Sequence, residues 1–276
     1  MTQRTILITG CSSGIGYHCA HALHKRGWRV FAACRRQTDC DRLVAEGLES
    51  VRLDYREPDS IAAAVDDVLT KTGGRLDALF NNGAYSHPGA VEDLPVEHVR
   101  RVMEANFLGW YDLTRRIVPV MRRQGAGRIV NCSSVLGFIG VRFTSAYTAT
   151  KFALEGWTDV LRLELADTDI HVCLIEPGPI RSRMIENARN MFVETVDIRT
   201  SPFRQAYGRE LSRLSSGHRS STFKLGPEAV FPRLLHALES PHPRARYRIT
   251  LPTHVGAWLK RLLPTVLLDR VLLRQR

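Results

Sequence analysis

The first 178 residues alternate short β-branched apolar runs with longer helical patterns, and this rhythm limits the folds open to the chain. Six runs read as strands, at residues 5–9, 28–33, 51–53, 76–80, 128–132 and 171–175. Helical patterns lie between them, at about residues 14–26, 60–70, 95–123 and 145–166. Strand–helix–strand units of this kind build a parallel sheet with helices on both faces. We therefore expect a doubly wound α/β fold.

Beyond residue 178 the alternation weakens. Residues 181–224 are polar and rich in Ser and Arg, which is typical of a long loop over a binding site. A helix at 227–238 and a strand at 246–251 follow, and residues 253–276 form an apolar and basic extension. No stretch of linker composition divides residues 1–178, so we expect one domain over residues 1–276.

The charge balance is strongly basic, with 39 Lys and Arg against 28 Asp and Glu and a net charge of +11. Such a surface attracts anions, which include phosphorylated cofactors, nucleic acid and acidic lipids. No block of five or six consecutive basic residues occurs, so we expect no nucleic-acid partner.

Six scattered cysteines form no CxxC pair, and no secretory signal precedes the first strand. This pattern predicts reduced thiols and a cytoplasmic protein. The spacing of His18, His21 and His24 distributes them around a helix, and no acidic partner is evident. We therefore interpret them as a solvated helix face and expect no metal.

A glycine-rich turn, TGCSSGIG at residues 9–16, joins the first strand to the first helix. Glycines allow a tight turn and a close approach of the backbone to phosphate, and the free N–H groups of the helix start face the negative charge. The spacing is GxxxGxG and not the common GxGxxG, so an ordinary glycine-rich turn is the alternative. The predicted phosphate contacts are Gly10, Ser12, Ser13, Gly14, Ile15 and Gly16.

The second strand ends in Arg35 and Arg36, where an acidic residue would bind the ribose of NAD. Two guanidinium groups would instead pair with a 2′-phosphate, so we expect NADP(H) to be preferred over NAD(H). The alternative is a solvated pair of arginines. Asp54 follows the third strand, and Asn82 and Gly83 follow the fourth, so all three lie at the carboxyl edge where ligands bind.

Tyr147 and Lys151 are four residues apart on a predicted helix, which places them on one face. A nearby ammonium stabilises a phenolate and is expected to lower the tyrosine pKa toward working pH. The tyrosine could then donate a proton to a forming alkoxide or accept one from an alcohol. Ser134, upstream in the loop before that helix, is placed to face Tyr147 and to hydrogen-bond a substrate oxygen. Its alternative role is to turn the chain.

Six motifs occur in the order and spacing of the short-chain dehydrogenase/reductase family, which the chain resembles from Thr5 to Ser182. They are TGCSSGIG, NNGA, EANFLG, the serine pair of VNCSS, YTATK and PGPIRS. Later segments are similar to a bacterial subgroup close to retinol and 17β-hydroxysteroid dehydrogenases. The resemblance implies a Rossmann-like sheet of about seven strands in a three-layer α/β/α arrangement.

The resemblance also assigns roles to matching positions. It implies Tyr147 as acid/base, Lys151 as a ribose contact that lowers the tyrosine pKa, Ser134 as the substrate-orienting hydroxyl and Asn106 as support for a proton-relay water. Asp54 would contact adenine and Asn82 the adenosine side. Pro177, Gly178, Ile180 and Ser182 follow the sixth strand, and Ile180 and Ser182 would hold the carboxamide end of the cofactor. The sequence departs from the family at NNGA, where NNAG is usual.

The expected activity is NADP(H)-dependent hydride transfer to or from an apolar aldehyde, ketone or alcohol that enters beneath residues 181–224. A homodimer or homotetramer paired through the two long helices is implied. Two alternatives remain: a non-catalytic NADP-binding regulator, and a peripheral membrane protein in which residues 255–273 contact an acidic interface. In the second case the cytoplasmic protein would lie at the membrane periphery. The same segment could instead form a helical flap over the substrate pocket or a contact between copies of the chain.

Overall fold

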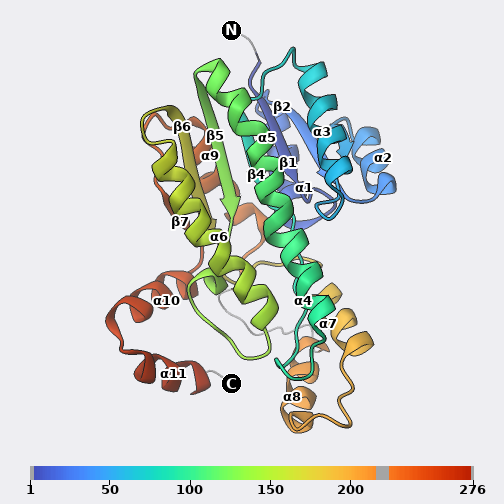
Figure 1. Cartoon of the computed structure of the whole chain (residues 1–276), viewed down its shortest axis with the longest axis vertical. Helices are drawn as coiled ribbons and strands as arrows, with labels where there is room; N and C mark the ends of the chain where they lie inside the picture. Colours follow the sequence, from blue (N-terminus) through green and yellow to red (C-terminus); the bar gives the residue numbers. More distant parts are fainter. Residues whose placement is uncertain (1–2, 216–223, 275–276) are drawn as a thin grey trace.

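The computed structural model describes residues 3–215 and 224–274, and its centre is one seven-stranded sheet (Figure 1). Every strand pair is parallel, and the spatial order is β3-β2-β1-β4-β5-β6-β7. The strands are β1 Thr5–Thr9, β2 Arg29–Cys34, β3 Glu49–Arg52, β4 Ala78–Asn81, β5 Ala126–Cys132, β6 Asp169–Glu176 and β7 Arg246–Arg248. The predicted doubly wound α/β fold is confirmed. Its strand order reverses between β1 and β4, where such sheets bind ligands.

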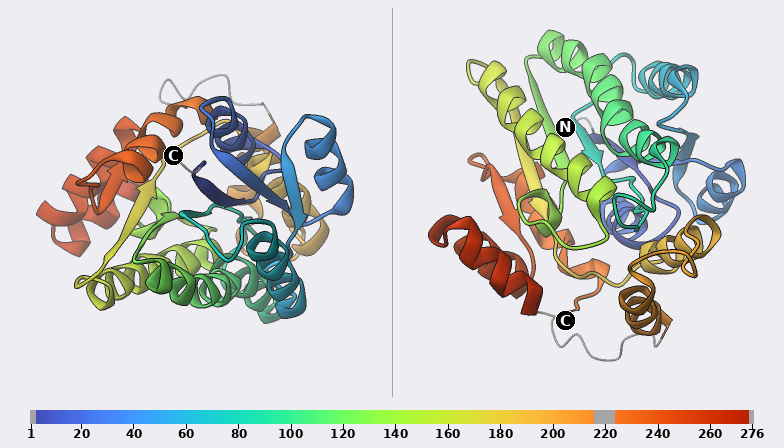
Figure 2. Two further views of the ribbon diagram at one scale, coloured as in Figure 1. Left: turned by 90° about the horizontal axis from the view of Figure 1, so that it is seen from above. Right: turned by 60° about the horizontal axis from the view of Figure 1, so that its bottom comes forward.

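Helices cover both faces of the sheet (Figure 2). On one face lie α1 Gly14–Lys25 and α9 Phe231–Glu239, and on the other lie α3 Pro58–Lys71, α5 Gly109–Gln124 and α6 Ser145–Glu164. The remaining segments are α2 Gln37–Ala45, α4 Val96–Met103, the π-helical turn η1 Glu104–Leu108, the 3₁₀ turns η2 Val135–Gly137 and η3 Pro227–Ala229, α7 Met184–Thr195, α8 Arg204–Ser215, α10 Leu251–Leu262 and α11 Thr265–Arg274.

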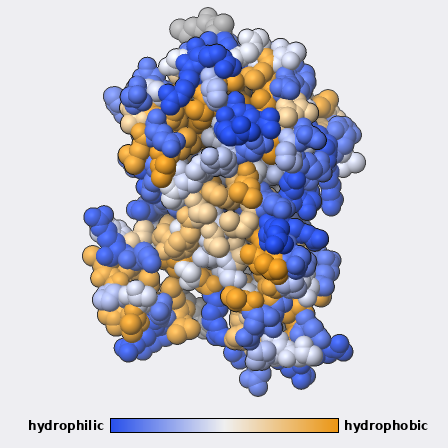
Figure 3. All heavy atoms as spheres, viewed as in Figure 1, coloured by the Kyte–Doolittle hydropathy of each residue, from blue (hydrophilic) through white to orange (hydrophobic). Residues whose placement is uncertain are grey.

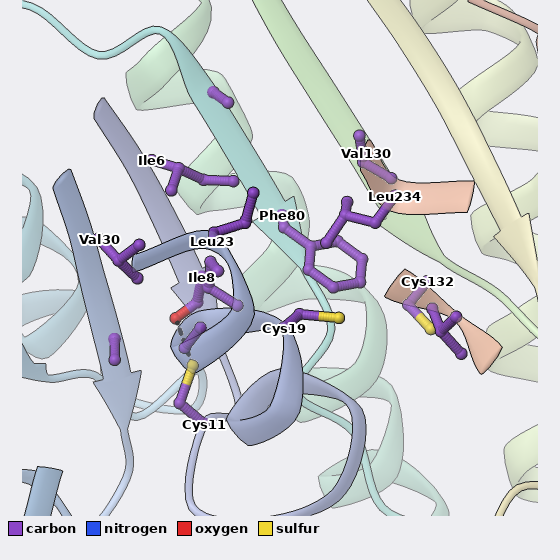
Figure 4. Packing of buried hydrophobic residues seen from close by; sticks show 14 of the residues in the cluster. Ile6, Ile8, Cys11, Cys19, Leu23, Val30, Phe80, Val130, Cys132 and Leu234 are labelled. Carbon is purple, nitrogen blue, oxygen red and sulfur yellow. Dashed lines mark hydrogen bonds between the residues drawn. The ribbon is translucent and has the colours of Figure 1, made fainter. Parts of the chain in front are cut away.

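The core on the α1 face packs strand side chains against α1 and α9 (Figure 4). Ile8, Phe80 and Val130 are fully buried on three adjacent strands, and Leu234 reaches them from α9. Cys11 follows β1, and its thiol donates to the Ile8 carbonyl over 3.1 Å. All six cysteines lie in the described part of the chain, where they are free and buried. Burial raises the pKa of the Cys132 thiol to about 11, so it stays protonated at neutral pH.

Residues 181–224 differ from the long irregular loop that the sequence predicts. The structure has two helices there, α7 and α8, while residues 216–223 lie outside the described ranges. The helices form because Phe192 and Tyr207 are buried together at 4.9 Å between ring centroids. The Tyr207 hydroxyl donates to Asp93 and accepts the Ala90 N–H. These anchors order a segment whose overall composition is polar.

The end of the chain is helical and interrupted. α10 ends at Leu262 and α11 begins at Thr265, so the break falls at Pro264, a residue that cannot continue a helix from the preceding turn. Among the described residues, no helix has the length and apolar character needed to cross a bilayer.

Candidate functional site

The predicted glycine turn lies between β1 and α1 at the carboxyl edge of the sheet. Gly10 and Gly14 have φ angles of +67° and +63°, which favour glycine. A Cβ on Gly10 would lie 2.5 Å from the Cα of Gly83, and one on Gly16 would lie 2.5 Å from the Gly10 carbonyl oxygen. Ser12, Ser13 and Ile15 occupy the same turn and helix start. The turn therefore presents bare backbone, with the N-terminus of α1 beside it.

The end of β4 packs directly on this turn. The Asn82 side chain donates to the Thr9 carbonyl over 3.1 Å, and the Asn82 N–H donates to the Thr9 hydroxyl over 2.9 Å. At Gly83 a Cβ would lie 3.2 Å from the Gly10 nitrogen. Glycine at this position, where the family usually has alanine, thus leaves room for the two segments to touch. Asn82 fixes the shape of the turn.

Arg35 and Arg36 are exposed at the end of β2, and neither makes an ion pair within residues 3–215 or 224–274. Two further arginines, which sequence reasoning missed, reach the turn itself. Arg42 on α2 and Arg183 before α7 each donate to the Ser12 carbonyl over 2.8 Å. A lone arginine carries no sequence signal for such a contact, since it depends on how α2 and the segment after β6 fold back.

Asp54 is buried after β3, where its carboxylate accepts the Arg56 N–H over 3.0 Å. Its neighbour Tyr55, which the sequence did not single out, is half-buried at this edge. The Tyr55 hydroxyl donates to the Thr9 hydroxyl over 2.7 Å, and its ring lies 6.0 Å from that of Trp110. Tyr55 thereby ties the ends of β3 and β1 together.

The segment after β6 returns to the same region. The Pro177 carbonyl accepts the Val135 N–H over 2.9 Å, and Gly178 contacts the side chain of Thr250 at the start of α10. Ile180 is buried and bridges Leu225. A Cβ on Gly14 would lie 3.3 Å from the Ser182 Cβ, so Ser182 borders the glycine turn.

Asn106 lies in the π-helical turn between α4 and α5, which the sequence predicted as continuous α-helix. The wider turn directs the Asn106 side chain inward, where it is fully buried. Its amide accepts the Tyr85 N–H over 3.1 Å and donates to the Tyr85 carbonyl over 2.8 Å. It also approaches the Thr150 hydroxyl on α6 at 3.4 Å. Hydropathy periodicity cannot distinguish a π turn of five residues from α-helix.

Tyr147, Lys151 and Ser134 come together at the carboxyl end of β5. Tyr147 and Lys151 are buried on one face of α6, and the half-buried Ser134 lies near Tyr147, where its hydroxyl acts to lower the tyrosine pKa. Lys151 donates to the Cys132 carbonyl over 2.8 Å. Its ammonium lies 4.5 Å from the centre of the Trp110 ring and 5.5 Å from that of Tyr147.

The expectation that Lys151 lowers the tyrosine pKa is wrong for the chain by itself. Burial raises the pKa of Tyr147 above its usual 10, the nearby Cys132 adds to the rise, and the nearby Ser134 hydroxyl opposes it. Burial also lowers the pKa of Lys151 to about 8. The ammonium bonds a backbone carbonyl and lies by the tyrosine ring, so desolvation decides both shifts.

Ser133 and Glu155 lie beside this group and were not singled out from the sequence. Both side chains are buried, and the Ser133 hydroxyl and one Glu155 carboxylate oxygen lack a hydrogen-bond partner. A Cβ on Gly137 would approach both, at 2.5 Å and 3.0 Å. Burial and then the neighbouring Glu176 raise the pKa of Glu155 to about 7.

The expected solvated histidine face needs one correction. His21 has an acidic partner, Glu46 at the C-terminal end of α2, at 2.8 Å. The two residues are far apart in sequence, so helix spacing alone could not show the pair. Over the described ranges, His, Cys, Asp and Glu side chains form no group of three or more suited to a metal.

The model of the short chain dehydrogenase family matches residues 4–192. The chain belongs to this family. It is 38% identical over 270 residues to the uncharacterized oxidoreductase YbbO of Escherichia coli, covering 98% of this chain and 94% of the relative. It is 33% identical to human 17-beta-hydroxysteroid dehydrogenase type 1, with coverages of 91% and 78%. Mouse retinol dehydrogenase 16 is 32% identical, with coverages of 99% and 88%.

Two solved structures extend the likeness to the fold. A short-chain dehydrogenase from Streptomyces avermitilis superposes with a TM-score of 0.79 at 29% identity, covering 98% of this chain and 94% of that one. An actinorhodin polyketide ketoreductase with NADPH has a TM-score of 0.75 at 29% identity, covering 91% and 97%. The predicted family and its likeness to hydroxysteroid and retinol dehydrogenases are confirmed, and the chain is an oxidoreductase of a family that binds NAD(P).

Proposed function

We propose that the protein transfers hydride between NADP(H) and an apolar aldehyde, ketone or alcohol, with Tyr147 as general acid/base. One observation carries the proposal. The buried Tyr147 and the half-buried Ser134 lie together beside the Lys151 ammonium, at the sheet edge that also holds the bare glycine turn. Two hydroxyls and a cation at one point can hold and protonate a carbonyl oxygen.

The glycine turn fits a dinucleotide. Side-chain atoms on Gly10 or Gly16 would collide with backbone, so only bare backbone and the start of α1 face this position. Gly10, Ser12, Ser13, Gly14, Ile15 and Gly16 would hold the pyrophosphate, with Asp54, Asn82 and Gly83 on the adenosine side and Pro177, Gly178, Ile180 and Ser182 on the carboxamide side. When bound, the nicotinamide ring supplies or accepts the hydride.

Side chains of the site would bind the substrate oxygen and exchange its proton. Ser134 hydrogen-bonds the substrate oxygen and turns it toward Tyr147. Tyr147 donates its proton to that oxygen in reduction and accepts it in oxidation. Lys151 holds the ribose and supplies positive charge near the developing phenolate. Asn106, fixed by Tyr85 and adjacent to Thr150, supports a proton-relay water from the π turn.

The preference for NADP(H) over NAD(H) is supported by Arg35 and Arg36. Both are exposed at the end of β2, where neither makes an ion pair in the described chain. A guanidinium without a carboxylate partner is available to a 2′-phosphate. The related ketoreductase, solved with NADPH, is consistent with this choice.

The proposed substrate class is supported by the side chains around the site and by the names of two relatives. We treat residues 1–276 as one domain in which α7 and α8, the described helices of the segment 181–224, cover the substrate. The aromatic side chains that anchor this segment, Phe192, Phe203 and Tyr207, pack with Phe143 from the loop before α6. An apolar cover favours a retinoid-, steroid- or lipid-like carbonyl, and two relatives carry hydroxysteroid and retinol dehydrogenase names. Cells generally keep NADP reduced, so reduction is the proposed direction.

The test is NADPH consumption with aliphatic, aromatic, retinoid and steroid carbonyls, beside a Tyr147→Phe control. Turnover of apolar carbonyls by the wild type alone supports the proposal. Tight NADPH binding without oxidation of any substrate would instead favour a non-catalytic regulator. Equal turnover with NADH would limit the proposal to the family's general activity.

A further inference from the structure

α10 presents an apolar stripe to solvent. Leu251, Val255, Trp258 and Leu262 are all exposed, and their spacing of four, three and four residues places them on one helix face. Trp258 is 62% exposed and Leu262 is 69% exposed. Soluble proteins rarely leave a continuous stripe of such side chains without a partner.

α11 continues this apolar surface after the break at Pro264. Val266, Leu267 and Leu273 are exposed, whereas Leu268 is buried toward α10 and the body. The two helices extend from the body of the molecule at its lower left (Figure 1). Figure 3 shows orange and blue atoms side by side on this lobe. We call the exposed side chains of α10 and α11 the terminal face.

The opposite side of α10 is fixed to the candidate site. Thr253 and Gly256 are buried there, and a Cβ on Gly256 would lie 2.6 Å from Ile139 and 3.7 Å from Phe138, which follow η2. The Thr250 and Thr253 hydroxyls are 3.0 Å apart and both border Gly178. α10 is therefore held in place by its inner side, and the stripe remains outside.

Positive charge flanks the terminal face. Lys260, Arg261, Arg270 and Arg274 lie on these two helices against one acid, Asp269, and within residues 3–215 and 224–274 none of the four cations makes an ion pair. The whole chain carries a net charge of +11. A face that combines exposed Trp and Leu with free cations matches the boundary of an anionic bilayer.

We propose that the terminal face docks on an anionic lipid surface. Trp258, Leu262 and Val266 would enter the boundary between headgroups and acyl chains, while Arg261, three residues after Trp258, and Arg270, four residues after Val266, contact the lipid phosphates. Pairing with a second copy fits less well, because it would bring these same cations together across a symmetric contact. Lipid binding is measured without turnover, so its result is independent of the proposed reaction.

The experiment is co-sedimentation of the full chain with phosphatidylcholine vesicles, with and without phosphatidylglycerol. We expect a several-fold larger bound fraction on the anionic vesicles. Trp258→Ser with Leu262→Ser, and separately Arg261→Glu with Arg270→Glu, should each return it to the level on neutral vesicles. Val44→Ser is the matched control, since Val44 is 57% exposed on α2, outside the terminal face, and should bind as the wild type does.

Tryptophan fluorescence gives a second readout, because Trp28 and Trp110 are buried and Trp157 is half-buried, whereas Trp258 is exposed. Anionic vesicles should shift the emission to shorter wavelength, and Trp258→Phe should abolish the shift while retaining sedimentation. Equal recovery of the wild type in the supernatant with both vesicles would overturn the proposal. A second result would also overturn it. If the Trp258→Ser, Leu262→Ser variant lost an oligomer that the wild type forms without vesicles, and its lipid binding were unchanged, the terminal face would be a contact with a second copy.

Discussion

Tyr147 is buried with the Ser134 hydroxyl nearby, and that environment sets the protonation of its phenol. Because burial raises the pKa of the phenol, the hydroxyl carries its proton at neutral pH in the chain by itself. A protonated phenol is ready to donate, which is the role that reduction of a carbonyl requires. Lys151 lies beside the tyrosine ring, and burial lowers its own pKa to about 8.

Replacing Tyr147 with Phe should abolish turnover, with a loss of at least about a hundredfold, because general acid catalysis contributes roughly 10²–10⁴. The phenyl ring keeps the packing on α6, so NADPH affinity measured by fluorescence titration should change little. Ser134→Ala should retain NADPH binding and lose less activity. Substantial turnover by Tyr147→Phe would show that another group moves the proton.

Replacing Arg35 and Arg36 with Ala should weaken NADPH far more than NADH. A charge-assisted hydrogen bond contributes about 1.5–3 kcal/mol, so the NADPH dissociation constant should rise roughly tenfold to a hundredfold. Arg123→Ala is the control, because Arg123 is exposed at the end of α5, at the opposite edge of the sheet. Equal weakening of both cofactors would mean that the pair does not read the 2′-phosphate.

Among the elements, the β1–α1 turn depends most on glycine, because its close packing leaves no room for side chains. Gly16→Ala should cost about 1–3 kcal/mol of unfolding free energy, because its Cβ would lie 2.5 Å from the backbone oxygen of Gly10. Gly208→Ala is the matched change in α8, where no atom lies within 4 Å of the added Cβ. It should stabilise the helix by roughly 0.5–1 kcal/mol. Urea unfolding measures both, and equal effects would contradict the close packing of the turn.

α6 aligns Tyr147, Lys151 and Glu155 at intervals of four residues, and the last of these makes stability depend on pH. Burial and Glu176 raise the pKa of Glu155 from its usual 4.5 to about 7, so between these values the folded chain binds more protons than the unfolded chain. The contribution of this group is therefore present below pH 4.5 and lost as pH rises through about 7.

Glu155→Gln removes this titration. The unfolding free energy of the variant minus that of the wild type should increase between pH 5 and pH 7, by about 1 kcal/mol per pH unit at most. Urea titrations at several pH values test this, and Asp66→Gln serves as the control at a site more exposed than Glu155. A difference that stays flat with pH would show that Glu155 ionises normally.

The strands were predictable from sequence because their β-branched runs are short, buried and bounded by polar or glycine residues, as at Thr5–Thr9. The motif residues were predictable as a group, because parallel strands bring their carboxyl ends to one edge. Contacts that depend on folding back, such as Arg183 to Ser12, leave no local signal. Helices α7 and α8 were missed for the same reason, since a few buried aromatics anchor a segment of polar composition.

At the scale of the whole molecule, a second exposed apolar surface lies across α5 and α6. Leu108 and Tyr111 on one side, and Val160 and Leu163 on the other, are all exposed, and the Tyr111 ring lies 5.7 Å from that of Trp157. These are the two long helices through which the resemblance implies pairing. We propose this surface, distinct from the terminal face, as the contact of a homodimer or of a homotetramer.

Leu163 is 73% exposed, which makes its replacement by Glu a test of assembly with little effect on the folded monomer. In a symmetric contact each copy would contribute the new carboxylate, so two desolvated and unpaired charges would enter the interface. The dissociation constant between copies should then rise by roughly a hundredfold or more, because about 3 kcal/mol is a low cost for such burial. Analytical ultracentrifugation should show a smaller mass for Leu163→Glu, whereas Val44→Glu, on the exposed side of α2, should sediment as the wild type does. If both variants keep the wild-type mass, the copies pair through another surface, and the apolar side chains of α5 and α6 remain in contact with solvent.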